Sequence, residues 1–183
     1  MTKYDLRISN NAALRAGELT MKQAIEYRLA EALIGHLQGV ADFAPAVLAE
    51  PFDREDQCQA LALAAGQYDF ALAVEPLPLR LPTDATDRTG VVEVQLAVNV
   101  LTTAQPMGML RSGAALAAAV MGQLLATCMV WREEVSSGIP YADPVPESVA
   151  ELDLSKFDAL SNLSGQALII SRKVNLRDYY RKR

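Results

Sequence analysis

The segment that most constrains the fold is residues 91–103, because one side of its alternating pattern is apolar at five consecutive positions. Successive side chains of a strand point to opposite faces of a sheet, so a period of two indicates a strand with one buried face. The apolar side consists of Val92, Val94, Leu96, Val98 and Val100. Glu93, Gln95 and Asn99 occupy the other side. We therefore expect a long strand whose apolar face packs against another layer.

An alanine-rich segment, residues 109–131, is the candidate for that layer. From Gly113 onward it is interrupted by only two polar side chains, Gln123 and Thr127, so it is long enough to cross a bilayer. Its apolar residues are largely Ala rather than Leu, Ile or Phe, and strand patterns lie on both sides of it, which favours a buried helix over a membrane span. Gly113 and Gly122 are expected to let this helix approach the sheet closely.

The N-terminal part of the chain predicts a helix over residues 20–38. Thr20 and Gln23 have the spacing of a capping box, and apolar residues then recur every three or four positions until Gly39. Residues 1–19 carry only scattered apolar side chains. We expect them to form an arm that needs a neighbour to lie on.

A second, half-buried strand is expected over residues 68–75, where large apolar side chains alternate with polar or small ones. Pro76, Pro78 and Pro82 then prevent regular strand pairing. Residues 83–90 have the composition of a turn. A hairpin with a polar loop is therefore expected to join this strand to the long one.

The other internal segments give weaker patterns. Residues 46–49 predict a short strand, and residues 58–65 fit either a strand or a short helix. Residues 133–153 contain three prolines and six acidic residues, which predicts a long surface excursion. Residues 153–163 predict one short helix.

A last strand is predicted over residues 167–176, where Arg172 interrupts an apolar face. The chain has 183 residues, 51% of them apolar, which suits one ordinary domain. Strands joined by turns rather than by helices are antiparallel. We therefore predict a single α+β domain over residues 1–183. It is expected to be a two-layer sandwich in which the N-terminal helix and the alanine-rich helix cover a mainly antiparallel sheet.

Charge is distributed unevenly along the chain. The net charge is −5, but residues 172–183 hold six basic residues and one acid, a charge of +5, which leaves −10 on residues 1–171. An acidic body argues against a general nucleic-acid binder. A basic tail, about residues 177–183, can dock on an acidic face of another copy and so produce head-to-tail assembly. A solvated tail is the alternative. The first residues lack the apolar core of a secretory signal, which predicts cytosolic synthesis.

No residue pattern predicts catalysis. His36 is the only histidine, so a His-based triad has no other candidate base and a two-histidine metal site is excluded. His36 could be a lone general base, but a helix histidine satisfied by a hydrogen bond is the expected role. Cys58 and Cys128 lack Cys-x-x-Cys spacing and are expected to be structural thiols. The acids within residues 53–56 and 84–87 lack the spacing of a calcium loop. We therefore expect no catalytic residue, no cofactor and no metal.

The order of elements resembles the tail terminator and head-tail completion proteins of tailed bacteriophages. The resemblance is carried by the helix at residues 21–37, a hairpin ending in the strand at 91–100, the helix at 109–131 and the strand at 168–176. It implies a structural virion protein rather than an enzyme. Such a protein would form a ring, usually sixfold, that caps the tail tube and joins it to the neck or head.

The same resemblance implies partners and a location. The partners would be further copies of the chain, the tail tube and the neck or head-tail connector proteins, with no membrane and with DNA only where the ring lines a channel. The protein would be made in the host cytoplasm and end in the tail or neck of the virion. The candidate subunit or partner contacts are Glu93, Gln95, Arg177, Tyr179, Tyr180, Arg181, Lys182 and Arg183.

Two other functions stay open at this point. One is a small soluble enzyme or ligand-binding α+β domain of unknown substrate, for which carboxylates, His36 and the two thiols would be the candidate groups. The other is a regulatory protein that binds nucleic acid through its basic tail.

Overall fold

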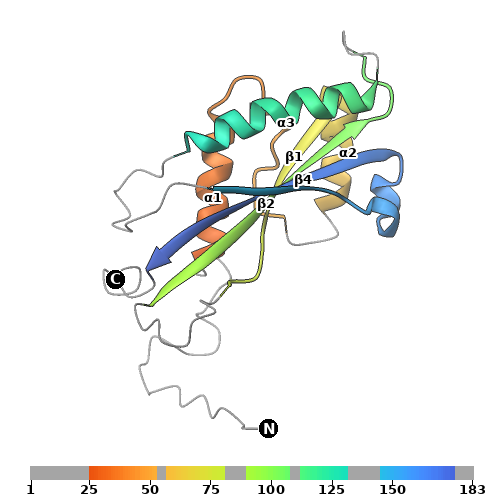
Figure 1. The fold of residues 1–183 in the computed structure, drawn as a ribbon. Helices are drawn as coiled ribbons and strands as arrows, with labels where there is room; N and C mark the ends of the chain where they lie inside the picture. The colour runs from red at the N-terminus through yellow and green to blue at the C-terminus, as the bar shows by residue number, and fades with distance from the viewer. Residues whose placement is uncertain (1–24, 53–56, 81–89, 108–111, 132–144, 176–183) are drawn as a thin grey trace, which may run out of the picture.

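The computed structural model describes residues 25–52, 57–80, 90–107, 112–131 and 145–175. Within these residues the chain forms three α-helices and a four-stranded antiparallel sheet with strand order β1-β2-β4-β3 (Figure 1). The predicted α+β class and antiparallel sheet are confirmed. The helices are α1 (Ile25–Gln38), α2 (Gln57–Tyr68) and α3 (Gly113–Met129), with short 3-10 helices η3 (Ala44–Ala46), η5 (Leu154–Lys156) and η6 (Asp158–Leu160). The strands are β1 (Phe70–Pro76), β2 (Val91–Thr103), β3 (Val145–Glu151) and β4 (Leu163–Asn175).

The strand predicted over residues 91–103 is confirmed as β2, which is central in the sheet. It pairs with β4 along its whole length, with Val91 opposite Asn175 and Thr103 opposite Leu163. On its other side it pairs with β1, which confirms the antiparallel pairing expected for a hairpin. The predicted apolar face is buried in one core together with α1 and α3, so both predicted helices cover the same face of the sheet.

The beginning of α3 lies against the end of β2. The Ser112 hydroxyl caps the helix by accepting a hydrogen bond from the Ala115 N–H, at 3.2 Å. A Cβ atom on Gly113 would overlap the carbonyl oxygen of Thr103, so only glycine permits this approach. An added Cβ at Gly122 meets nothing within 4 Å. The close-approach role is therefore correct for Gly113 and wrong for Gly122.

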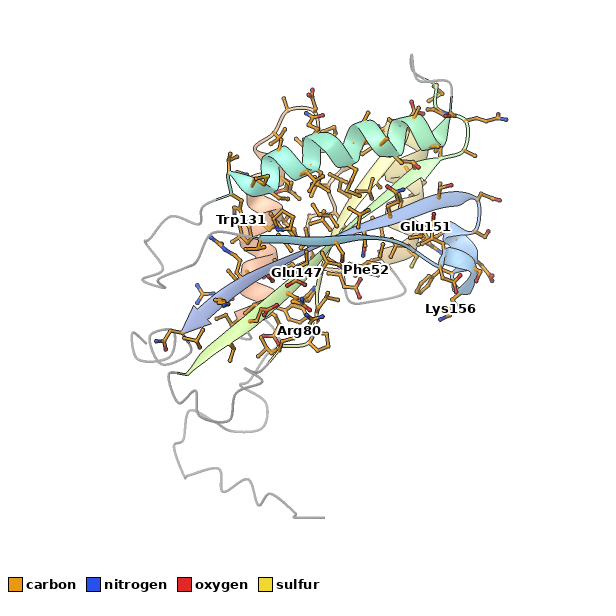
Figure 2. All side chains as sticks on the ribbon, viewed as in Figure 1. Phe52, Arg80, Trp131, Glu147, Glu151 and Lys156 are labelled. Atoms are coloured by element: carbon orange, nitrogen blue, oxygen red, sulfur yellow. The ribbon has the colours of Figure 1, made fainter. Side chains whose placement is uncertain are left out.

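Arg172, which interrupts the apolar pattern of β4, has a structural role. Its guanidinium carbon lies 4.3 Å from the ring centroid of Trp131, just after α3, and Arg172 is only 4% exposed. A guanidinium stacked on an indole gains cation–π attraction, and more when both are desolvated. This pair joins α3 to β4 inside the core. Figure 2 labels Trp131 just beyond the end of α3.

The second face of the sheet is also covered, so the two-layer description is incomplete. Residues 58–65, which fitted a strand or a helix, lie in α2. This helix packs with η6 on Ala71 and Ala73 of β1 and on Leu101 of β2. Because the side chains of a strand alternate, these residues point away from α1 and α3. At this end of the sheet β1 is thus buried on both faces. The prediction that this strand is only half-buried is therefore wrong.

Asp69 forms the junction between α2 and β1. It has a φ of 67°, the left-handed region that Asp tolerates better than most residues. Its backbone oxygen accepts from the Thr103 N–H at 3.0 Å, and its side-chain Oδ1 accepts from the Met107 N–H at 2.9 Å. The junction therefore fixes α2 at the end of β2.

Three weaker predictions need correction. Residues 46–49 form no regular strand: Ala46 ends η3, and Val47 makes one isolated bridge to Leu72. The segment 133–153 is not wholly an excursion, because residues 145–151 form the edge strand β3, where Pro146 is tolerated and a bulge follows it. Residues 153–163 contain two 3-10 helices in place of one short helix.

Several predictions fall outside the described residues. They are the capping box at Thr20–Gln23, the arm at 1–19, the polar loop at 83–89 and residues 133–144 and 177–183. Within the described ranges, no helix combines the length and apolar character needed to cross a bilayer.

Candidate functional site

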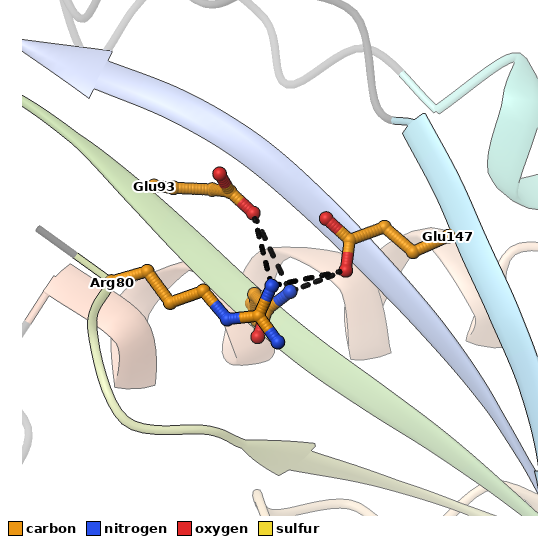
Figure 3. A network of polar contacts seen from close by, with 4 residues as sticks. Arg80, Glu93 and Glu147 are labelled. Carbon is orange, nitrogen blue, oxygen red and sulfur yellow. Dashed lines mark hydrogen bonds and ion pairs between the residues drawn. The ribbon is translucent and has the colours of Figure 1, made fainter. Parts of the chain in front are cut away.

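Two features of the sheet face that carries α2 are candidates for function: a polar cluster and a pocket. The polar cluster comprises Arg80, Glu93, Gln95 and Glu147, and we call it the carboxyl cluster (Figure 3). Nη1 of Arg80 lies 4.0 Å from Oε1 of Glu93 and 3.8 Å from Oε2 of Glu147. Nε2 of Gln95 donates to both carboxylates, at 3.4 Å for Glu93. The cluster therefore joins β2, β3 and the chain that follows β1.

The backbone holds the carboxyl cluster in place. Arg80 and Glu93 exchange both backbone hydrogen bonds, at 2.9 and 3.0 Å, in an isolated bridge beyond the end of β1. Glu147 lies in the bulge of β3 between Pro146 and Ser148. A bulge redirects a side chain out of the regular alternation, which explains how an edge strand contributes a carboxylate to this face.

Glu147 perturbs the ionisation of Glu93. The pKa of Glu93 is raised above its ordinary value, first by a hydrogen bond shared with the Glu147 carboxyl group, then by partial burial and by the negative charge of Glu147. Arg80 and Lys173 act in the opposite direction. Two carboxyl groups that share a proton can act as an acid–base pair. The same two carboxyl groups can also link β2 to β3 with a strength that depends on pH.

The second feature, which we call the Asn99 pocket, is a cavity of about 140 Å³ at the end of the sheet nearer α2, η5 and η6. Apolar side chains form most of its wall, including Phe52, Leu61, Leu101, Phe157 and Leu160. Glu75, Asn99 and Asp153 supply its polar atoms.

The polar part of the Asn99 pocket presents acceptors. Nδ2 of Asn99 donates to Oε2 of Glu75 at 3.0 Å. Asn99 is 5% exposed, and its buried Oδ1 accepts no hydrogen bond from the residues that the structure describes. A buried polar atom without a partner costs free energy. Because Oδ1 is also shielded from solvent, a ligand that donates a hydrogen bond removes that cost only if the Asn99 amide turns toward the cavity.

Of the predicted contact residues, the structure describes only two. Glu93 and Gln95 lie together in the carboxyl cluster, but Gln95 is 4% exposed and so is part of the protein interior. In this chain its side chain contacts Glu93 and Glu147. The other six, Arg177, Tyr179, Tyr180, Arg181, Lys182 and Arg183, lie outside the described residues.

The histidine and the two cysteines that an enzyme could use are all engaged in the packing of the fold. Nε2 of His36 in α1 donates to the Thr127 carbonyl oxygen in α3 at 3.1 Å. Cys58 and Cys128 are buried, and burial raises the pKa of the Cys128 thiol to about 12, far above the range of a reactive thiolate. No group of three His, Cys, Asp or Glu side chains in the described part of the chain is placed to hold a metal ion. The acids of residues 53–56 and 84–87 lie outside it.

Sequence reasoning missed Arg80, Glu147 and the Asn99 pocket. Glu147 had been placed in a surface excursion, and Arg80 follows two prolines that mark the end of a strand. Only Asn99 could have pointed to the pocket, because it is a polar residue between two valines of the central strand. No protein-family model matches the chain, and no curated protein is significantly similar to it.

Proposed function

We propose that this protein is a structural subunit that associates head to tail into a ring and caps the tail tube of a bacteriophage at its junction with the neck or head. The proposal extends the resemblance in element order. It does not require catalysis, and it assigns the polar segments of the chain to contacts with other subunits.

The observation that carries the proposal is a group of acidic residues at one end of β4, whose other end continues in sequence into the basic residues 176–183. At the end where β4 begins, four acids lie on or near the sheet, and we call this the acidic end: Asp69, Glu151, Asp153 and Asp158. Lys156 is the only basic residue between residues 145 and 171. Figure 2 shows Glu151 and Lys156 at this end.

The opposite end of β4 leads into the basic tail. β4 ends at Asn175, opposite Val91. Residues 176–183 then carry Arg177, Arg181, Lys182 and Arg183 against the single acid Asp178. A surface that is acidic at one end and basic at the other favours heterologous contacts, which close into a ring when the rotation between copies is suitable.

The structural roles of His36 and Cys128 add support. One side chain bonds two helices together, and the other is buried in the core. Both groups are thus accounted for without a reaction.

Mass measurement of the purified full chain tests the proposal. We expect a closed oligomer at micromolar concentration that dissociates as salt rises, because charged surfaces attract less strongly when screened. Reversing the tail charges (Arg181→Glu, Lys182→Glu) or those of the acidic end (Asp153→Lys, Asp158→Lys) should each weaken assembly. For the acidic-end variant, Glu26→Lys with Glu31→Lys on α1 is a control that changes the net charge by the same amount and in the same direction on another element. A monomer at every concentration, alone and with tail tubes, would refute the proposal.

A ligand-binding domain is the second candidate, and the Asn99 pocket is the observation that favours it. A cavity with apolar walls and a few polar groups is typical of small-molecule sites. Under this function the full chain stays monomeric and a small hydrogen-bond donor raises its melting temperature.

A further inference from the structure

We propose that the Asn99 pocket receives a tyrosine side chain from the basic C-terminal tail of a second copy of the chain. This inference rests on the proposed self-association and names the contact that produces it. Three observations carry it: the chemistry of the pocket, the sequence of the tail and the distance between them.

The pocket has the chemistry of a phenol site. Its volume of about 140 Å³ is close to that of apolar cavities, about 150 Å³, that accept a benzene ring. Phe52 and Phe157 in its wall can contact an aromatic ring at its face or edge. Because the Asn99 amide N–H is already donated to Glu75, the Asn99 oxygen is left as an acceptor. Oδ1 is shielded from solvent in this conformation, so a phenol O–H donates to it once the Asn99 amide turns toward the cavity.

The tail supplies such a group in a suitable charge setting. Tyr179 and Tyr180 are flanked by Arg177 and Arg181. The polar lining of the pocket includes the carboxyl groups of Glu75 and Asp153. Tyrosine and arginine are the residues that most often dominate the binding energy of protein interfaces, and here the arginines would face acidic residues.

The tail cannot reach the pocket of its own chain. Asn99, the proposed partner of the phenol, is opposite Ala167, eight residues before Asn175 along β4, a distance of roughly 26 Å. Tyr180 is five residues beyond Asn175 and extends its backbone by at most about 18 Å. Occupancy by the tail therefore requires a second copy, and repetition of the contact links copies head to tail.

A complementation experiment tests the contact in the full chain. One variant, Tyr179→Ser with Tyr180→Ser, lacks the two tyrosine rings of the tail and keeps the pocket. The other, Leu154→Trp, fills the pocket at a partly exposed lining residue and keeps the tail. Each variant alone should be monomeric in sedimentation, whereas an equimolar mixture should form a dimer, because one intact contact remains. A Tyr179→Phe, Tyr180→Phe variant keeps the rings and should weaken association by about three- to tenfold.

A peptide measurement is independent of how Leu154→Trp folds. A labelled peptide of residues 175–183 should bind the Tyr179→Ser, Tyr180→Ser chain, and its double-serine counterpart should bind at least tenfold more weakly. If the parent chain assembles and the double-serine chain assembles equally well, the tyrosine contact is wrong while the proposed ring stands. Equal binding of the two peptides also overturns it. A parent chain that never assembles refutes the proposed function itself.

Discussion

At the scale of single residues, the hydrogen atom that Gly113 carries in place of a side chain fixes how close α3 comes to the sheet. Gly113→Ala places a methyl group on the backbone oxygen of Thr103, so the helix or the strand end must move. We expect a loss of about 1–3 kcal/mol in the free energy of unfolding, as for other overpacked sites. Denaturant titration measures it.

Gly122→Ala is the matched control within the same helix. The added methyl group meets no atom within 4 Å, and alanine favours a helix over glycine by roughly 0.5–1 kcal/mol. We expect this variant to be more stable than the parent. If both variants lose stability equally, the close approach at Gly113 is not what makes glycine necessary there.

Glu93 gives the residue-scale prediction for pH. Its pKa in the folded protein is raised above the ordinary value of 4.5, so between those two values the folded state binds more protons than the unfolded state. The free energy of unfolding therefore falls as pH rises through that window. Glu93→Gln should reduce this fall and raise the melting temperature at pH 7 by about 1–3 °C.

Thermal melts between about pH 4 and pH 7.5 measure the effect of Glu93→Gln. Glu31→Gln removes the same charge at an exposed position of α1 and serves as the control. A parallel shift of both variants at every pH would mean that net charge, and not the carboxyl cluster, determines the response.

At the scale of elements, β2 is buried on both faces. Leu96 on the α1 and α3 side is 2% exposed, and Ala97 on the opposite side is 3% exposed. We expect Leu96→Asp and Ala97→Asp each to cost several kcal/mol, because either places an unpaired carboxylate in the interior. That is much of the stability of a typical domain. Ser148→Asp on the exposed edge strand should melt like the parent, and circular dichroism distinguishes the three. An Ala97→Asp variant that folds normally would mean that the second face is open.

The elements also differ in how far the sequence could predict them. β2 was predicted with its observed bounds, since one face of its alternating pattern is apolar at five consecutive positions. The first four residues of β4 were missed because Ser164, Gly165 and Gln166 interrupt the pattern. β3 was missed because prolines and acids indicate a loop, although both are compatible with an edge strand.

Tertiary partners explain why the candidate sites could not be predicted. Gln95 is buried in contact with Glu147, 52 residues further along the chain, and the wall of the Asn99 pocket combines residues from 52 to 160. The face of β2 opposite the valines carries Glu93, Gln95 and Asn99, so its sequence predicts exposure to solvent. Its burial depends on segments whose own patterns are weak.

At the scale of the whole molecule, self-association should make thermal stability depend on protein concentration. If folded copies bind one another and unfolded chains do not, mass action raises the melting temperature as concentration rises. We expect a higher melting temperature at high than at low micromolar concentration, a difference that shrinks at about 0.5 M salt. Scanning calorimetry measures it. The Tyr179→Ser, Tyr180→Ser chain should show no concentration dependence, and a parent chain that shows none would contradict head-to-tail assembly.

The Trp131–Arg172 stack also provides an optical probe. Trp131 is the only tryptophan of the chain and is 1% exposed, so the tryptophan fluorescence of the protein comes from a single indole ring that is shielded from water and lies against a cation. Its emission therefore follows the docking of α3 on β4 at one site. Since the Asn99 pocket lies at the other end of the sheet, unchanged tryptophan emission together with a loss of assembly would identify a variant that is folded but no longer binds its neighbours.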